Sequence, residues 1–148
     1  MIAFAACSDS SGGKDDAAEY ITAAEAVADY RERATELSLA PGTVWEDEPW
    51  GLEAKDSDGV AVMYGLSVGR QQAEFWWLCS WQGRTLNTSG REREVALGEI
   101  EKFRGYEAYK WMDDNGHKMF ESYLASARLG DMTEMNAAES AACNHPGG

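Results

Sequence analysis

The stretch from Phe75 to Trp81 constrains the fold more than any other part of this chain, because it is apolar nearly all round. The residues just before it, Gln71 to Glu74, favour a helix. A helix with no polar face must be covered on most of its sides. A buried strand is the alternative, since the stretch is short and aromatic. We expect a central helix that starts at Gly69-Arg70 and runs to Leu86.

Four further segments place apolar residues at helical spacing, with charged residues opposite. They are residues 17–39, 91–112, 117–129 and 131–143. Asp15 and Asp16 can cap the first of these helices. Asp131 with Glu134 resembles a capping box at the start of the last one. Gly105 interrupts the second segment and predicts a kink or a close helix crossing there.

Residues 40–68 are the irregular part of the chain. Pro41-Gly42 ends the preceding helical pattern, and Asp56-Ser57-Asp58-Gly59 is a turn signal. We expect residues 52–55 and 60–64 to pair across this turn. The predicted fold is therefore mainly α: a compact bundle of about five helices, with an irregular insert or small β-hairpin near residues 40–68.

Size and charge limit the classes of function. The chain has 148 residues, which suits one domain. Its formal net charge is −13 and its sequence pI is near 4.4. Nucleic-acid binding requires patches of Lys and Arg, so this class is excluded. The sequence contains no run of eighteen apolar residues, as a membrane-spanning helix would require.

Small and apolar residues precede Cys7, and a polar run follows it. Phe4-Ala5-Ala6-Cys7 resembles the lipobox of bacterial lipoproteins. In that family the cysteine is lipidated and becomes the first residue of the mature protein. The resemblance implies an extracytoplasmic protein anchored to the bacterial cell membrane by lipidated Cys7. Residues 1–16 would be a lipobox remnant and flexible tether, and residues 17–148 a single helical domain. An unmodified thiol at Cys7 is the alternative.

Export has a consequence for the other two cysteines, Cys79 and Cys143. With Cys7 carrying lipid, they form an even pair in an oxidising compartment, which predicts one disulfide. The bond would staple the last helix to the aromatic central one. In a cytosolic protein both would instead be free thiols.

Tryptophans beside carboxylates mark the candidate ligand-binding residues, which are Trp45, Asp47, Glu48 and Trp50. Exposed indole rings near acidic groups suit a cationic or sugar ligand. Alternatively, both rings fold back and cap the helix bundle. On the central helix, Trp76 and Trp77 point about 100° apart. One ring is therefore expected to lie deep in the protein and the other nearer its surface. Core packing is the expected role of these rings, and an aromatic groove that holds a ligand is the alternative.

No motif singles out a catalytic residue, a metal site or a cofactor. Asp56 and Asp58 do not supply the spacing of a calcium-binding loop. His117 and His145 lack a third ligand at a suitable spacing for zinc.

The leading hypothesis is a membrane-tethered, non-catalytic binding or interaction module of the cell envelope, whose partner is an envelope protein or a glycan. One alternative is an envelope enzyme with a carboxylate-based site that acts on cell-wall glycans. The other is a structural accessory subunit of an envelope complex.

Overall fold

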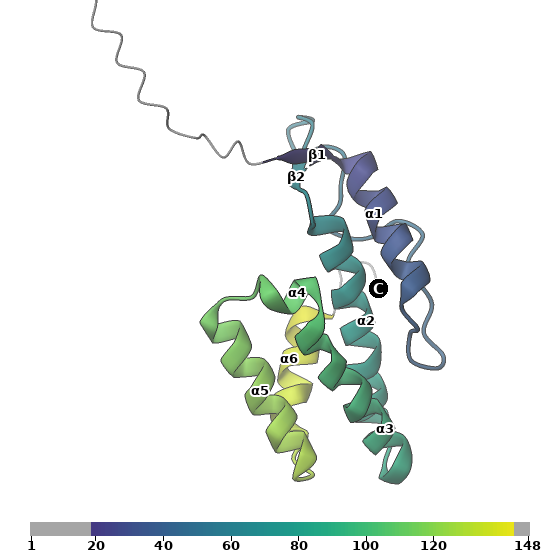
Figure 1. Cartoon of the computed structure of the whole chain (residues 1–148), viewed down its shortest axis with the longest axis vertical. Coiled ribbons are helices and arrows are strands. Elements are labelled where there is room, and N and C mark those ends of the chain that lie inside the picture. Colours follow the sequence, from purple (N-terminus) through teal and green to yellow (C-terminus); the bar gives the residue numbers. More distant parts are fainter. Residues whose placement is uncertain (1–18, 144–148) are drawn as a thin grey trace, which may run out of the picture.

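The computed structural model describes residues 19–143, and this part of the chain is mainly helical, as predicted (Figure 1). The elements, in chain order, are β1 (Tyr20–Thr22), α1 (Ala23–Glu36), β2 (Met63–Gly65), α2 (Val68–Asn87), α3 (Gly90–Glu101), η1 (Lys102–Gly105), α4 (Glu107–Lys110), α5 (Asp114–Arg128) and α6 (Thr133–Ala142). Cys7, its tether and His145 lie outside the described residues. None of the helices within residues 19–143 combines the length and the apolar character that a membrane span needs.

Helix α2 is the centre of the domain, which confirms a helix over the aromatic stretch. It packs against α1, α3, α4 and α6. These neighbours explain why residues 75–81 are apolar on nearly every side. Trp77 is buried at 1% exposure, whereas Trp76 is half-buried, so the two neighbouring rings do lie at different depths.

Two apolar clusters hold the helices together. The larger cluster lies between α2 and the helices that follow it, and its largest fully buried members are Trp77, Ile100, Phe103, Phe120, Leu124 and Met135. The smaller cluster joins α1 to α2 and the insert through Ala26, Tyr30, Leu52 and Ala73. The insert is therefore packed onto the helices and not free of them.

The start of the first helix differs from the prediction. Residues Tyr20–Thr22 form strand β1, and α1 begins only at Ala23. Thr22 is the N-cap: its Oγ1 accepts the N–H of Glu25 at 3.2 Å, while Glu25 Oε2 accepts the N–H of Thr22 at 2.7 Å. This capping box follows the Thr-x-x-Glu pattern and fixes the helix start, so the cap proposed at Asp15 and Asp16 was wrong for α1.

The insert contains a tight turn, and the predicted pairing of residues 52–55 with 60–64 across it is present in a short form, in which the N–H of Val62 also donates to the carbonyl of Ala54 at 3.0 Å. Asp56 Oδ1 accepts the N–H groups of Asp58 and Val60, both at 2.9 Å, and Gly59 has a φ of +79°. A single antiparallel bridge joins Lys55 to Ala61 next to this turn. The strand proper, β2, lies further on and pairs antiparallel with β1, which precedes α1 in the chain.

The helix expected over residues 91–112 is broken into α3, η1 and α4. The break lies just after Gly105, where Tyr106 has an extended backbone with φ −92° and ψ 158°. It turns two rings inward: Phe103 is fully buried, and Tyr106 packs edge-on against Trp77 with ring centroids 5.0 Å apart. Burial of these two rings accounts for the interruption of the helix.

The last helix also starts differently from the prediction. Asp131 Oδ1 accepts the N–H of Thr133 at 3.0 Å, but Glu134 does not complete a capping box. Its Oε2 instead accepts the hydroxyls of Ser122 and Ser126 on α5, at 2.8 and 3.1 Å. Glu134 therefore joins α6 to α5, two helices that lie side by side in Figure 1.

Candidate ligand-binding groove

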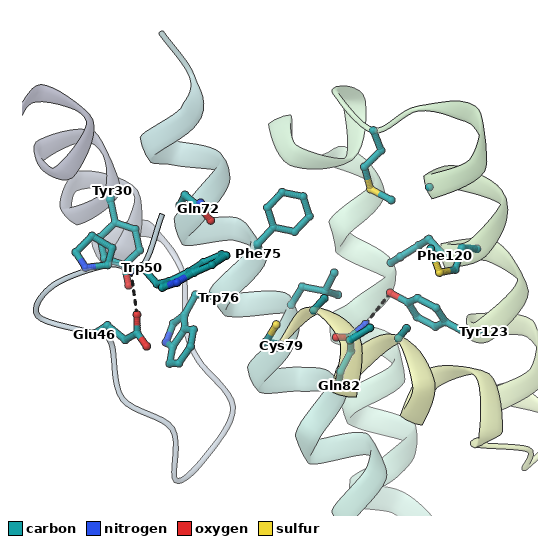
Figure 2. A pocket seen from close by; sticks show the side chains of 18 residues that line it. Tyr30, Glu46, Trp50, Gln72, Phe75, Trp76, Cys79, Gln82, Phe120 and Tyr123 are labelled. Carbon is teal, nitrogen blue, oxygen red and sulfur yellow. Dashed lines mark hydrogen bonds between the residues drawn. The ribbon is translucent and has the colours of Figure 1, made fainter. Parts of the chain in front are cut away.

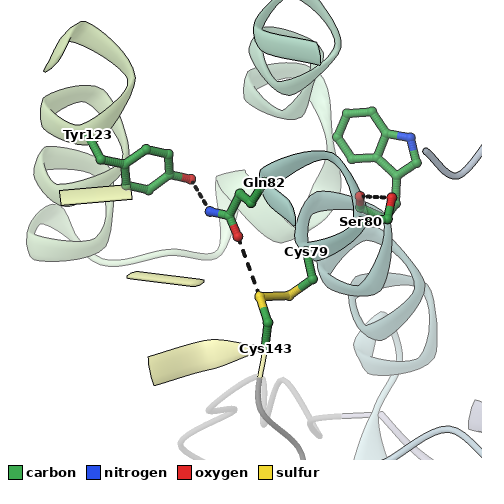
Figure 3. Close-up of a disulfide and its surroundings, with 6 residues drawn as sticks. Cys79, Ser80, Gln82, Tyr123 and Cys143 are labelled. Atoms are coloured by element: carbon green, nitrogen blue, oxygen red, sulfur yellow. Dashed lines mark hydrogen bonds between the residues drawn. A yellow bond between two sulfur atoms is a disulfide. The ribbon is translucent and has the colours of Figure 1, made fainter. Parts of the chain in front are cut away.

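The predicted disulfide is present and fixes one side of the candidate site. Cys79 of α2 is bonded to Cys143, which directly follows α6, with a Cα–Cα distance of 5.7 Å (Figure 3). Gln82, one turn further along α2, lies between this bond and α5. Its Nε2 donates to the hydroxyl of Tyr123 at 2.9 Å, and its Oε1 lies 3.5 Å from Cys143 Sγ. These contacts hold α6 and α5 at a set position relative to α2.

A groove of about 350 Å³ opens between three parts of the chain (Figure 2). The insert contributes Glu46, Pro49 and Trp50; α2 contributes Gln72, Phe75, Trp76, Leu78, Cys79 and Gln82. The opposite side comes from Met112, the α5 residues Gly116, Met119, Phe120 and Tyr123, and the α6 residues Ala138, Ala141 and Ala142. Tyr30 of α1 closes the end near the insert. Most of these side chains are apolar.

Large apolar side chains remain exposed at this groove. Trp50 is 49% exposed, Met119 58% and Phe75 37%. Exposed apolar residues that gather around a concave surface are typical of a site for a ligand or a partner. The groove is therefore the strongest candidate for function in this part of the molecule.

The end of the groove near the insert is polar and aromatic. Figure 2 shows Tyr30, Glu46, Trp50 and Trp76 close together there. Glu46 Oε2 accepts the backbone N–H of Trp50 at 3.3 Å, and Trp76 Nε1 donates to the carbonyl of Val44 at 3.0 Å. These bonds hold the carboxylate and the Trp76 ring in place, so the end of the groove is formed without a ligand.

Tyr30 is 2% exposed. Among the buried side-chain nitrogen and oxygen atoms of residues 19–143, its hydroxyl oxygen is the one that makes no hydrogen bond of normal geometry. Burial, together with the negative charge of Glu46, raises the pKa of Tyr30 to about 12, although the nearby backbone N–H of Glu46 offsets part of the rise. The hydroxyl therefore stays protonated at neutral pH, and Glu46 provides the charge at this end.

The four residues proposed as a ligand site do not form one site. Trp50 lines the groove, but Trp45 packs edge-on against Tyr30, with ring centroids 5.8 Å apart and an interplanar angle of 89°. Trp45 thus fits the alternative in which an insert ring covers the helices. Asp47 is exposed and lines a separate hollow beside α1 together with Trp45, and Glu48 is exposed on the same loop.

Part of the groove was missed by sequence reasoning. Met119, Ala138 and Ala142 belong to the apolar faces of the helices predicted over residues 117–129 and 131–143, a pattern that is typical of core residues. Glu46 follows Trp45 in the sequence and is not among the four predicted ligand-binding residues. No local signal marks these residues, because their exposure depends on the space between the insert and the α5–α6 pair.

Within residues 19–143, no three His, Cys, Asp or Glu side chains lie close enough together to hold a metal ion.

Comparison of the chain with protein-family models, with curated proteins and with solved structures found no significant match.

Proposed function

We propose that this domain is a non-catalytic binding module of the cell envelope that holds an apolar ligand, or the apolar part of a larger one, in the groove. The observation that carries the proposal is the groove itself: a concave, mostly apolar surface of about 350 Å³ with exposed Trp50 and Met119 at its edge. Small-molecule sites are commonly clefts of about 300–1,000 Å³ with this kind of lining.

The rigidity of the walls supports binding. The disulfide fixes the end of α6 to α2, and the Gln82–Tyr123 hydrogen bond of 2.9 Å fixes α5 to α2. Bonds to Glu46 and Trp76 fix the insert side. A site whose walls are already in place loses little conformational entropy when a ligand enters.

The proposed location is the outer side of a bacterial cell membrane, with lipidated Cys7 as the anchor. Two observations support it: the lipobox-like sequence around Cys7, and the Cys79–Cys143 disulfide, since such bonds persist mainly in oxidising compartments. Mass spectrometry of the protein from its host membranes tests this part, because a diacylglyceryl or acyl mass on Cys7 is expected and an unmodified thiol would contradict it.

The carboxylate-based glycan enzyme is less well supported by this site. Such enzymes place two carboxyl groups about 5–10 Å apart across the sugar. The described residues that line the groove include one carboxylate, that of Glu46. An accessory subunit would use the same apolar surface against a partner protein.

Binding of a neutral apolar dye, Nile red, to the full chain tests the proposal. Ala141 lines the groove near the end of α6 and is itself exposed, so Ala141→Trp fills the groove without entering the core. Ala137 is exposed on the same helix and does not line the groove, so Ala137→Trp is the matched control. We expect saturable fluorescence enhancement that Ala141→Trp abolishes and Ala137→Trp preserves. No saturable binding, or equal binding by both variants, would overturn the proposal.

A further inference from the structure

We propose that the ligand of this groove is a cationic amphiphile, with one positively charged head group beside Glu46 and an apolar tail along α2 towards α6. This inference rests on the proposed function and adds the chemical class of the ligand. It follows from the distribution of charge and aromatic rings along the groove.

Glu46 is the charged side chain in the described lining of the groove. It is half-buried, and no ion pair within residues 19–143 involves it. Arg31 of α1 lines a neighbouring hollow together with Glu46, but its Nη2 donates to the carbonyl of Asp47 at 3.4 Å, and Arg31 does not line the groove. A partly desolvated carboxylate without a counter-ion favours a ligand that carries a positive charge.

Aromatic rings surround the same position. Trp50, Trp76 and Tyr30 lie around the carboxylate in Figure 2. The faces of tryptophan rings attract ammonium groups, most strongly where water is excluded, and Trp50 and Trp76 retain exposed surface here whereas Tyr30 is buried. An anionic head group would be repelled by the nearby carboxylate of Glu46 and, more weakly, by the overall charge of −13. The site therefore selects against anionic ligands.

The rest of the groove suits the tail. Its other lining residues include Phe75 and Leu78 of α2, Met119 of α5 and Ala141 of α6. This stretch carries no charged side chain among the described residues. A volume of about 350 Å³ suits one small amphiphile and not a folded partner element.

A series of ligands with one tail and three heads tests the inference by isothermal titration calorimetry on the full chain. Decyltrimethylammonium, decyl glucoside and decyl sulfate share a ten-carbon tail and carry a cationic, a neutral and an anionic head, and they are used below their micelle-forming concentrations. We expect the cation to bind about tenfold tighter than the neutral compound, because tenfold in affinity lies between the values for an exposed and for a desolvated cation–π contact. Decyl sulfate should bind weakest.

Two charge variants separate a local effect from the overall charge. Glu46→Gln keeps the acceptor for the Trp50 N–H but removes the charge from the groove. Glu48→Gln removes the same charge from the same loop outside the groove. The preference for the cation should disappear in Glu46→Gln and persist in Glu48→Gln, with unchanged melting temperatures.

The outcomes separate this inference from the function on which it rests. Equal affinity for all three heads, with binding still blocked by Ala141→Trp, would overturn the cationic class and leave the apolar site standing. Equal loss of preference in Glu46→Gln and Glu48→Gln would assign the effect to net charge and would also overturn it. Absence of binding by every amphiphile would overturn both.

Discussion

Arg33 Nε lies 3.0 Å from Glu74 Oε1, and this ion pair joins α1 to α2 inside the domain. Glu74 is only 1% exposed, and its second oxygen accepts the backbone N–H of Ala108 at 2.7 Å, in the first turn of α4. The first N–H groups of a helix have no partner within it. One buried carboxylate therefore connects three helices and satisfies one of these groups on α4, while the Arg33 guanidinium lies 4.9 Å from the centre of the Tyr106 ring.

Glu74→Ala should lower the free energy of unfolding by about 3–5 kcal/mol, because it leaves the half-buried Arg33 cation and the Ala108 N–H without this partner. Urea denaturation measures the change. Glu101→Ala is the control, since Glu101 pairs with Arg128 on the surface, where such pairs contribute about 0–1 kcal/mol. A loss in Glu74→Ala of no more than about 1 kcal/mol, as expected for Glu101→Ala, would show that the buried network is not stabilising.

The disulfide should contribute about 4 kcal/mol, because it closes a loop whose ends are 64 residues apart in the unfolded chain. Unfolding of the wild type with and without reductant measures this contribution. Cys79→Ser should match the reduced wild type, and reductant should not affect its stability further. A wild-type stability that is the same in both redox states would contradict the predicted role of the bond.

Two glycines of α2 should respond in opposite directions to alanine. A Cβ on Gly69 would lie 2.0 Å from the carbonyl oxygen of Ala26, so α1 must move away. We expect Gly69→Ala to cost about 1–3 kcal/mol. At Gly83 a Cβ meets no atom within 4 Å, so alanine should raise stability by up to about 1 kcal/mol through helix propensity. Thermal unfolding of both variants tests the close crossing of α1 and α2. A Gly69→Ala variant as stable as the wild type would contradict it.

Stability should fall in strong alkali. Burial raises the pKa of Tyr123, and burial with the charge of Glu46 raises that of Tyr30 to about 12. Because a tyrosine in the unfolded chain titrates near pH 10, the folded state holds these protons more tightly. This contribution is complete below about pH 10 and is lost as the pH rises through about 12. Urea denaturation across that range measures the loss.

Tyr30→Phe provides the control for this pH dependence. It removes a buried hydroxyl that lacks a hydrogen bond of normal geometry, so stability at neutral pH should be nearly unchanged. Its loss of stability in alkali should be smaller than that of the wild type. An identical alkaline profile would show that Tyr30 does not hold its proton in the folded state.

The sequence predicted those features that depend on local pattern or on counting. Residues 75–81 could be assigned to a covered helix because they lack a polar face, and two cysteines beyond Cys7 predicted the Cys79–Cys143 bond. The features it missed depend on distant partners. Strand β1 forms because β2 lies beside it, and the break before α4 is stabilised by Glu74 on α2.

The groove is also a feature that depends on residues distant in the sequence. Trp50 was recognised by its acidic neighbourhood, but the role of Glu46 depends on Tyr30 and Trp76, which come from other segments. Met119 follows a core-like spacing and is nevertheless exposed, because the insert and α5 do not meet.

The most direct test of the groove as a binding site is the NMR signal of each indole N–H during titration with decyltrimethylammonium and decyl glucoside. Trp50 and Trp76 line the groove, whereas Trp111 is 68% exposed and lies outside its lining. With either amphiphile the account predicts that the signals of Trp50 and Trp76 shift together and saturate, while that of Trp111 stays in place. Equal shifts at Trp111, or no shift at Trp50 and Trp76 with both compounds, would contradict it.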